Sequence, residues 1–178
     1  MQSDSNSSTT GATGDPKSGI IRSVTPDDVP ALKALIDTVD LFPSAMLDDM
    51  MTDYLTNPAS SDCWLTDTGL AGVAYYAPER LTEGTWNLYL IAIHPDRQGQ
   101  GRGAALIRYV EQALRERGER LLLVETSGLP KYEYQRAFYR RCGYVEEARI
   151  RDFYQAGEDK VVFWKALTPK NTVRGKVS

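Results

Sequence analysis

The stretch that decides the fold is LYLIAIHPDRQGQGRGAALI, residues 88–107. It begins as an apolar strand over 88–93, passes through a glycine-rich turn and continues as a helix. Glycine lets the backbone approach a ligand closely, and the free N–H groups at the start of a helix favour phosphate. The stretch therefore predicts a turn that binds a pyrophosphate.

Other interpretations of this turn can be weighed against that one. A P-loop is excluded, because it requires Gly-Lys-Ser/Thr where the chain has Gly-Arg-Gly at 101–103. A dinucleotide motif G-x-G-x-x-A can be aligned with Gly99, Gly101 and Ala104, but it should follow its strand at once in a βαβ unit. Here Pro95 and its neighbours intervene, after strands joined by short connections. Glycines that serve only a tight strand-to-helix turn remain the structural alternative.

The flanking sequence supplies the rest of the fold. Apolar periodicity predicts a short strand over 19–24 and two amphipathic helices that start near Thr25 and Met46. The elements predicted after them are strands over 63–66, 70–77 and 86–93, a helix over 105–117, a fully apolar buried strand over 121–125, a helix over 134–141, and strands over 144–149 and 161–167. This order indicates a mixed sheet covered by helices, in the α/β or α+β class.

Length and composition indicate one globular domain. The chain has 178 residues, of which 42% are hydrophobic and 25% charged. Residues 1–19 are rich in Ser, Thr and Gly and are expected to form a disordered arm. Residues 20–167 form the predicted domain, and 168–178 a flexible basic tail. We find no transmembrane segment or export signal in the sequence, so the expected location is the cytoplasm, without membrane contact.

Several classes of partner and metal site are disfavoured. His94 is the single histidine, which excludes sites built on two histidines. Cys63 and Cys142 form no C-x-x-C pair and are expected to be free thiols, so we expect no metal cofactor. The net charge is −3 although the tail is basic, so the core of the chain is acidic. An acidic core argues against nucleic acid as a partner. The sequence leaves homodimer formation open.

The turn and its surroundings resemble the GCN5-related N-acetyltransferase (GNAT) family. Gln98, Gly101 and Gly103 match the family's acetyl-CoA signature, Gln/Arg-x-x-Gly-x-Gly/Ala, between a strand and a helix. Further matches, in the family's order, are the runs Ile-His-Pro-Asp at 93–96, Ala-Phe-Tyr at 137–139 and Gly-Tyr at 143–144. The resemblance covers residues 20–167. It implies the GNAT fold, a mixed, mostly antiparallel sheet of about seven strands flanked by four helices, with a splayed central strand pair.

The resemblance also implies the site. The pantetheine arm of acetyl-CoA, the co-substrate, would lie between the strands over 88–93 and 121–125. The cofactor-binding residues it implies are Ile91, Ala92 and Ile93 for pantetheine, and Gln98, Gly99, Gln100, Gly101, Arg102, Gly103 and Ala104 for pyrophosphate. Tyr139 would protonate the leaving thiolate, and Glu125 would deprotonate the incoming ammonium, directly or through water. The alternatives are a core tyrosine and a solvated carboxylate, and His94 is left with a structural role.

The acceptor implied is a primary amine on a small molecule or peptide. One departure from the family is Tyr132, which stands where many relatives have an asparagine that contacts pantetheine. The family's variable acceptor walls correspond to residues 40–44 and 152–159. Acidic residues near the first helix pair and in the final hairpin favour a cationic acceptor, although they are equally compatible with a solvated acidic face: Asp40, Asp48, Asp49, Asp53, Asp152, Glu158 and Asp159. The rival function is a non-catalytic acyl-CoA-binding or sensor domain.

Overall fold

The computed structural model describes residues 19–167; the predicted basic tail and, apart from Gly19, the predicted arm lie outside them. The strands are β1 Ile21–Ser23, β2 Cys63–Asp67, β3 Gly72–Pro78, β4 Thr85–Ile93, β5 Leu121–Ser127, β6 Val145–Gln155 and β7 Glu158–Ala166. The α-helices are α1 Val29–Val39, α2 Met46–Thr56, α3 Arg102–Glu116 and α4 Glu133–Arg141, with short 3-10 helices η1 Pro26–Asp28, η2 Pro95–Arg97 and η3 Pro130–Tyr132. No helix in this part of the chain is long and apolar enough to cross a membrane.

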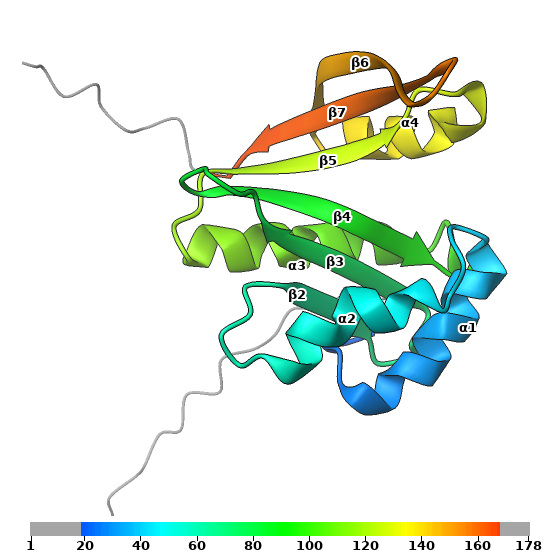
Figure 1. Ribbon diagram of the computed structural model, residues 1–178, viewed down its shortest axis with the longest axis vertical. Helices are drawn as coiled ribbons and strands as arrows, with labels where there is room; N and C mark the ends of the chain where they lie inside the picture. The colour runs from blue at the N-terminus through cyan, green and yellow to red at the C-terminus, as the bar shows by residue number, and fades with distance from the viewer. Residues whose placement is uncertain (1–18, 168–178) are drawn as a thin grey trace, which may run out of the picture.

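All seven strands form one sheet in the order β1-β2-β3-β4-β5-β7-β6 (Figure 1). Among the strand pairs of residues 19–167, only β4 and β5 run parallel, and the others are antiparallel. The parallel pairing ends where Leu88 lies opposite Val124, although β4 continues to Ile93 and β5 to Ser127. The central strands therefore splay apart, and the predicted mixed, mostly antiparallel sheet with four α-helices is confirmed.

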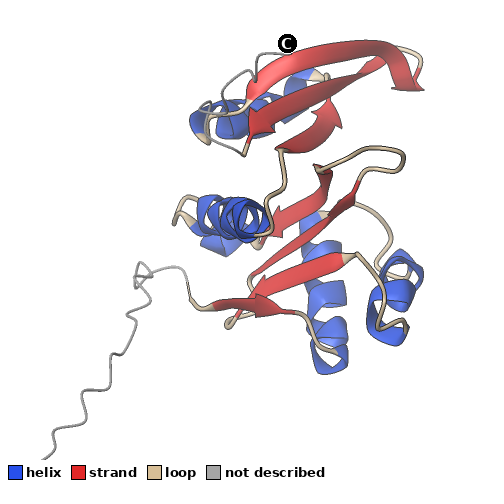
Figure 2. Cartoon of the chain, turned by 90° about the vertical axis from the view of Figure 1, so that its left-hand side faces the viewer, coloured by secondary structure: helices blue, strands red, loops and turns tan. Residues whose placement is uncertain are grey.

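Helices cover both faces of the sheet (Figure 2). One core cluster joins α3 and α4 to the sheet through residues such as Leu106, Tyr139 and Phe163, and the other joins α1 and α2 through residues such as Leu32 and Met51. The strand predicted over 121–125 is longer than expected and is not fully buried: Leu122, Val124 and Ser127 are buried, and the other residues are partly exposed. Glu125 is one of these partly exposed residues.

Other element boundaries that differ from the sequence prediction include those of α3 and β6. Helix α3 begins at Arg102 rather than 105, so Gly103 lies inside its first turn. Strand β6 continues to Gln155, and the expected loop over 152–159 is a strand pair closed at residues 156–157. An irregularity interrupts this pair, and there Asp152 has a φ of 53° while its N–H donates to Asp159 Oδ1 at 3.2 Å.

The entry to α1 is fixed by a buried carboxylate. Asp28 accepts hydrogen bonds from the Thr25 backbone N–H at 2.8 Å and from the Arg22 guanidinium at 2.6 and 2.8 Å. These contacts, that of Arg22 above all, hold the pKa of Asp28 well below its usual value. The predicted proline and acidic capping residue are therefore present at this helix start. The contact of Asp28 with Arg22 also joins the helix start to β1.

Candidate active site

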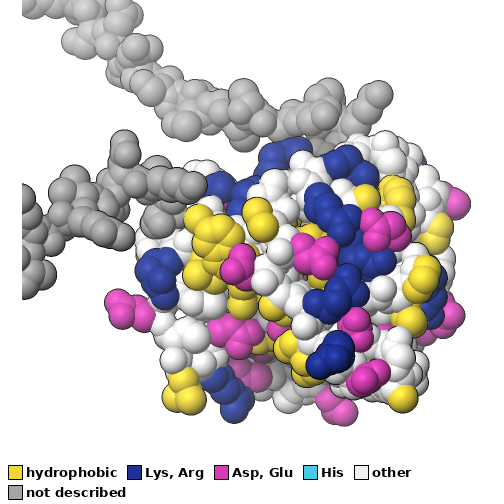
Figure 3. All heavy atoms as spheres, turned by 90° about the horizontal axis from the view of Figure 1, so that it is seen from above, with side chains coloured by type: hydrophobic (Ala, Val, Ile, Leu, Met, Phe, Trp, Pro, Cys, Tyr) yellow, Lys and Arg dark blue, Asp and Glu magenta, His cyan; other side chains and the backbone are white. Residues whose placement is uncertain are grey.

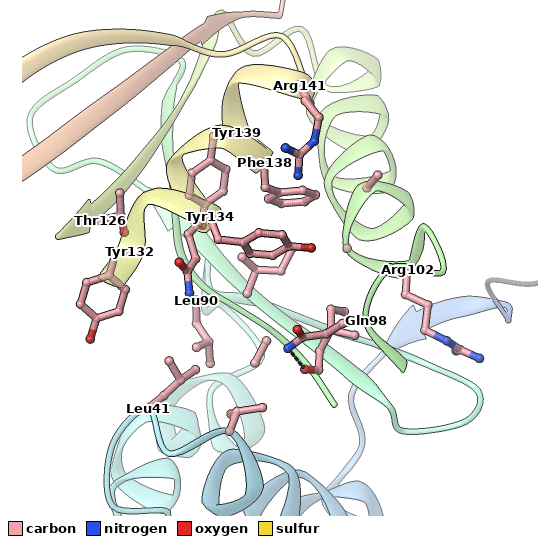
Figure 4. A pocket seen from close by; sticks show the side chains of 18 of the residues that line it. Leu41, Leu90, Gln98, Arg102, Thr126, Tyr132, Tyr134, Phe138, Tyr139 and Arg141 are labelled. Atoms are coloured by element: carbon pink, nitrogen blue, oxygen red, sulfur yellow. Dashed lines mark hydrogen bonds between the residues drawn. The ribbon is translucent and has the colours of Figure 1, made fainter. Parts of the chain in front are cut away.

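A cavity of about 520 Å³ opens where β4 and β5 separate. It is lined from both faces of the sheet: by the first turn of α3 and by Phe138 and Tyr139 of α4 on one side, and by Val39, Leu41 and Tyr89 on the other. Figure 4 shows Tyr139 and Phe138 facing Leu41 across this space. Because residues of both faces meet in it, the cavity passes through the gap between the splayed strands.

The glycine turn forms one end of the cavity. Gly101 is the N-cap of α3 with a φ of 79°, and a Cβ atom added there or at Gly99 would meet no atom within 4 Å. Within residues 19–167, the N–H groups of residues 102–104 donate to no backbone carbonyl, as expected for the first turn of a helix. The turn therefore offers unpaired N–H donors beside open space, which suits the pyrophosphate of a coenzyme.

Two glutamines hold the turn in place. Gln98 Nε2 donates to the Ile93 carbonyl at 3.1 Å, across the end of β4. Gln100 Nε2 donates to the Asp96 carbonyl at 3.2 Å, and Gln100 does not line the cavity. The other residues assigned to the coenzyme from the sequence all line it: Ile91, Ala92, Ile93, Gln98, Gly99, Gly101, Arg102, Gly103 and Ala104.

The Arg102 side chain has a different position from the one its place in the motif suggests. It points away from the other labelled cavity residues in Figure 4 and forms an ion pair with Asp67, the last residue of β2. Both side chains are largely buried, with 16% and 4% exposed. The backbone of Arg102 belongs to the turn, while its guanidinium fixes the first turn of α3 to the sheet.

Tyr139 is buried on α4 and reaches the cavity. Its ring packs against Phe163 and Tyr144, with centroids 5.5 and 6.3 Å apart. Burial raises the pKa of its hydroxyl above the usual value, so Tyr139 is protonated at neutral pH. No hydrogen bond to another residue of the described chain engages this hydroxyl, which suits a group that gives its proton to a ligand.

Glu125 lines the same cavity from β5. Lys160 of β7 donates to Glu125 Oε2 at 2.8 Å, and no residue in 19–167 donates to Oε1. The sequence did not indicate this lysine, because the contact depends on the antiparallel pairing of β5 with β7. One carboxylate oxygen is thus held, and the other remains available to accept a proton.

The acidic residues expected around the acceptor do not line the cavity, and several have partners elsewhere. Asp48 pairs with Lys33 at 2.6 Å, and Asp159 with Arg149 at 3.4 Å. Figure 3, seen from the side of β6, β7 and α4, shows basic side chains interspersed with acidic ones. Of the seven acidic residues, Asp48 and Asp159 thus have a basic partner, and none of the seven belongs to the cavity wall.

Several lining residues were not singled out from the sequence. Tyr134 and Arg141 of α4 and Thr126 of β5 lie around the cavity with Tyr132, which occupies the position of the family asparagine. Arg97 adds a positive charge beside the turn. Tyr134 and Arg141 share α4 with Tyr139 but not its helical face, so no periodic pattern in the sequence signalled them. In the described part of the chain, no three His, Cys, Asp or Glu side chains come together as a metal site.

Comparisons with known proteins agree with this geometry. The model of the acetyltransferase (GNAT) domain matches residues 59–146. A GNAT-family acetyltransferase from Desulfovibrio desulfuricans is 33% identical, with a TM-score of 0.78 over 84% of this chain and 99% of that chain. A search of the curated proteins finds no match.

More distant structures share the fold. The ribosomal-protein-S18-alanine N-acetyltransferase of Escherichia coli is 23% identical, with a TM-score of 0.66 over 86% of this chain and 98% of that chain. An aminoglycoside 6'-N-acetyltransferase complexed with coenzyme A is 17% identical, with a TM-score of 0.69 over 86% and 99% of the two chains. The 33% identity over most of both chains and the match to the domain model establish that the chain belongs to the GNAT family and is an acyltransferase with the GNAT fold.

Proposed function

We propose that the protein transfers the acetyl group of acetyl-CoA directly to a primary amine of a small molecule or peptide. The observation that carries this proposal is the single cavity in which Tyr139, Glu125 and the glycine turn meet. A relative of the same fold was crystallised with coenzyme A, which supports an acyl-CoA co-substrate. Direct transfer needs the proton acceptor and the proton donor around one reacting carbon, and this cavity supplies both.

Glu125 is assigned the role of general base. Its Oε1, directly or through water, takes a proton from the ammonium group, so that a neutral amine can attack the thioester carbonyl. Lys160 holds the other carboxylate oxygen and so orients the base. The edge of β4 beyond Leu88 has no partner in β5, and its N–H groups are placed to stabilise the oxyanion.

Tyr139 is assigned the role of general acid. As the carbon–sulfur bond breaks, its hydroxyl gives a proton to the departing thiolate. The raised pKa of Tyr139 supports this role, because the proton is present throughout the neutral pH range. A non-catalytic acyl-CoA-binding domain would not need a proton donor at the cavity, so it would not require a buried tyrosine hydroxyl that lacks a hydrogen-bond partner.

A thiol-release assay tests the proposal. The protein is mixed with acetyl-CoA and a panel of primary amines, and free thiol is measured together with the mass of the acetylated amine. Thiol release that depends on the amine, with one acetyl group gained per thiol, is expected. Binding of acetyl-CoA without release for any amine or peptide in the panel would favour the non-catalytic alternative.

A further inference from the structure

A row of four side chains on the α1 and α2 face of the sheet carries two carboxylates without a basic partner. We call Asp62, Tyr75, Tyr89 and Glu79 the carboxylate–tyrosine row. The two tyrosine rings stack with centroids 5.5 Å apart. Tyr75 donates to Asp62 Oδ2 at 3.2 Å, and Tyr89 donates to Glu79 Oε1 at 2.9 Å. Within residues 19–167, no lysine or arginine forms an ion pair with either carboxylate.

The row begins beside the candidate base. Tyr75 lies opposite Leu90 and Tyr76 opposite Leu88, so Tyr89 is the extra residue of a bulge in β4. Tyr89 directly follows Leu88, and Glu125 directly follows Val124, which is the last residue of β5 paired with β4. Tyr89 and Glu125 therefore lie at the point where the strands separate. Both line the cavity.

The charge at Glu79 is held in place and left uncompensated. Asn87 Nδ2 and the Tyr89 hydroxyl both donate to Glu79 Oε1, each at 2.9 Å, and no residue of the described chain donates to Oε2. Burial, followed by the contact with Glu79, raises the pKa of Tyr89 to about 12, so the hydroxyl remains a donor at neutral pH. Glu125, by contrast, already has Lys160 as its partner.

We propose that the carboxylate–tyrosine row binds a second cationic group of the acceptor. This inference rests on the proposed function, and it specifies the acceptor as a flexible aliphatic amine with a further ammonium group several bonds from the reacting nitrogen. Tyr75 is stacked between Trp64 and Tyr89, so the ring face of Tyr89 that points away from Tyr75 is the one that can attract a cation. Glu79 supplies a charge-assisted hydrogen bond. Tyr89 is 49% exposed, so its ring face is accessible. The row thereby selects diamines over monoamines of equal length.

The test compares cadaverine with n-pentylamine, which has the same five-carbon chain but lacks the second ammonium group. The measured quantity is the ratio of kcat/KM for the diamine to that for the monoamine. The wild-type protein should prefer the diamine. Glu79→Gln should reduce this ratio about tenfold, because the amide keeps the shape and the acceptor oxygen but loses the charge.

Glu83→Gln is the matched control, since it removes an equal charge from an exposed residue of the same β3–β4 connection. The ratio should be unaffected in this variant. An equal ratio in wild type and Glu79→Gln would overturn the inference while leaving the proposed function intact. If neither amine releases thiol, calorimetry of cadaverine binding decides: weaker binding to Glu79→Gln than to wild type supports the row, and equal or absent binding refutes it.

Discussion

The Arg102 guanidinium and the Asp67 carboxylate, 35 residues apart in the sequence, form a largely buried ion pair. Asp67 Oδ1 also accepts a hydrogen bond from the Ala71 N–H at 2.8 Å, so the same carboxylate shapes the β2–β3 turn. Ala71 in turn accepts a hydrogen bond from the His94 N–H at 2.8 Å, just after β4. The turn before α3 is thus fixed to the sheet by side chains that need not touch the coenzyme.

Replacing Asp67 should weaken acetyl-CoA binding through the position of this turn. In Asp67→Asn the guanidinium loses its charged partner, and we expect the Kd for acetyl-CoA to rise about tenfold, with a smaller change in kcat. Calorimetry and steady-state kinetics measure the two effects. Asp96→Asn is the control, because it removes an equal charge from an exposed residue of the connection between β4 and α3. Equal Kd values in both variants would leave the ion pair with a purely structural role.

Gly101 and Gly118 allow a matched test of the turn. Both have a φ of 79°, and a Cβ atom at either would meet nothing within 4 Å. Alanine at each site should therefore cost similar stability, about 1 kcal/mol. Only Gly101→Ala should weaken acetyl-CoA binding, since its Cβ would enter the space beside the free N–H groups. Unchanged affinity in Gly101→Ala would remove this turn from the coenzyme site.

Asp28 should make the stability of the fold depend on pH. Its folded pKa is lowered, chiefly by Arg22, so its contribution is complete above the unfolded value of about 4 and declines as the pH falls below it. Asp28→Asn should lower the free energy of unfolding by about 2 kcal/mol at pH 7. Urea unfolding at pH 7 and pH 3 should show the difference from wild type shrinking at the lower pH. Exposed Asp27→Asn, the control, should have little effect at either pH.

The sequence predicted each strand and α-helix of the fold and missed a stretch of β6 whose exposure shows no period. The apolar stripe of α3 and the apolar run of β4 can be recognised in the sequence, and the order of such elements along the chain indicated the fold class. The second half of β6 was not predicted, because that edge strand is exposed on both faces and shows no alternation. Gly103 was placed in the loop, but it lies in the first turn of α3, where a Cβ would be 3.2 Å from Phe138 Cζ and the ring would have to shift.

The site residues that belong to short sequence motifs could be predicted. Contacts between residues far apart in the sequence could not. The glycine turn and Tyr139 belong to short motifs, whereas Lys160 meets Glu125 only through strand pairing. Tyr89 lies in a bulge, which shifts the register of β4 against β3 and is not visible in an apolar strand. The count of acidic residues along the chain could not show which of them line the cavity or have a basic partner, such as Asp48 with Lys33 and Asp159 with Arg149.

Tyr139→Phe should separate binding from chemistry. The ring and its packing are preserved, so the affinity for acetyl-CoA should be retained, whereas loss of the proton donor should lower kcat by about a hundredfold or more. Tyr144→Phe is the control: this neighbouring tyrosine is equally buried but does not line the cavity. In pH profiles, wild-type kcat should show no loss near the usual tyrosine pKa of about 10, because the pKa of Tyr139 is raised. Equal kcat in wild type and Tyr139→Phe, with chemistry rate-limiting, would return Tyr139 to the core.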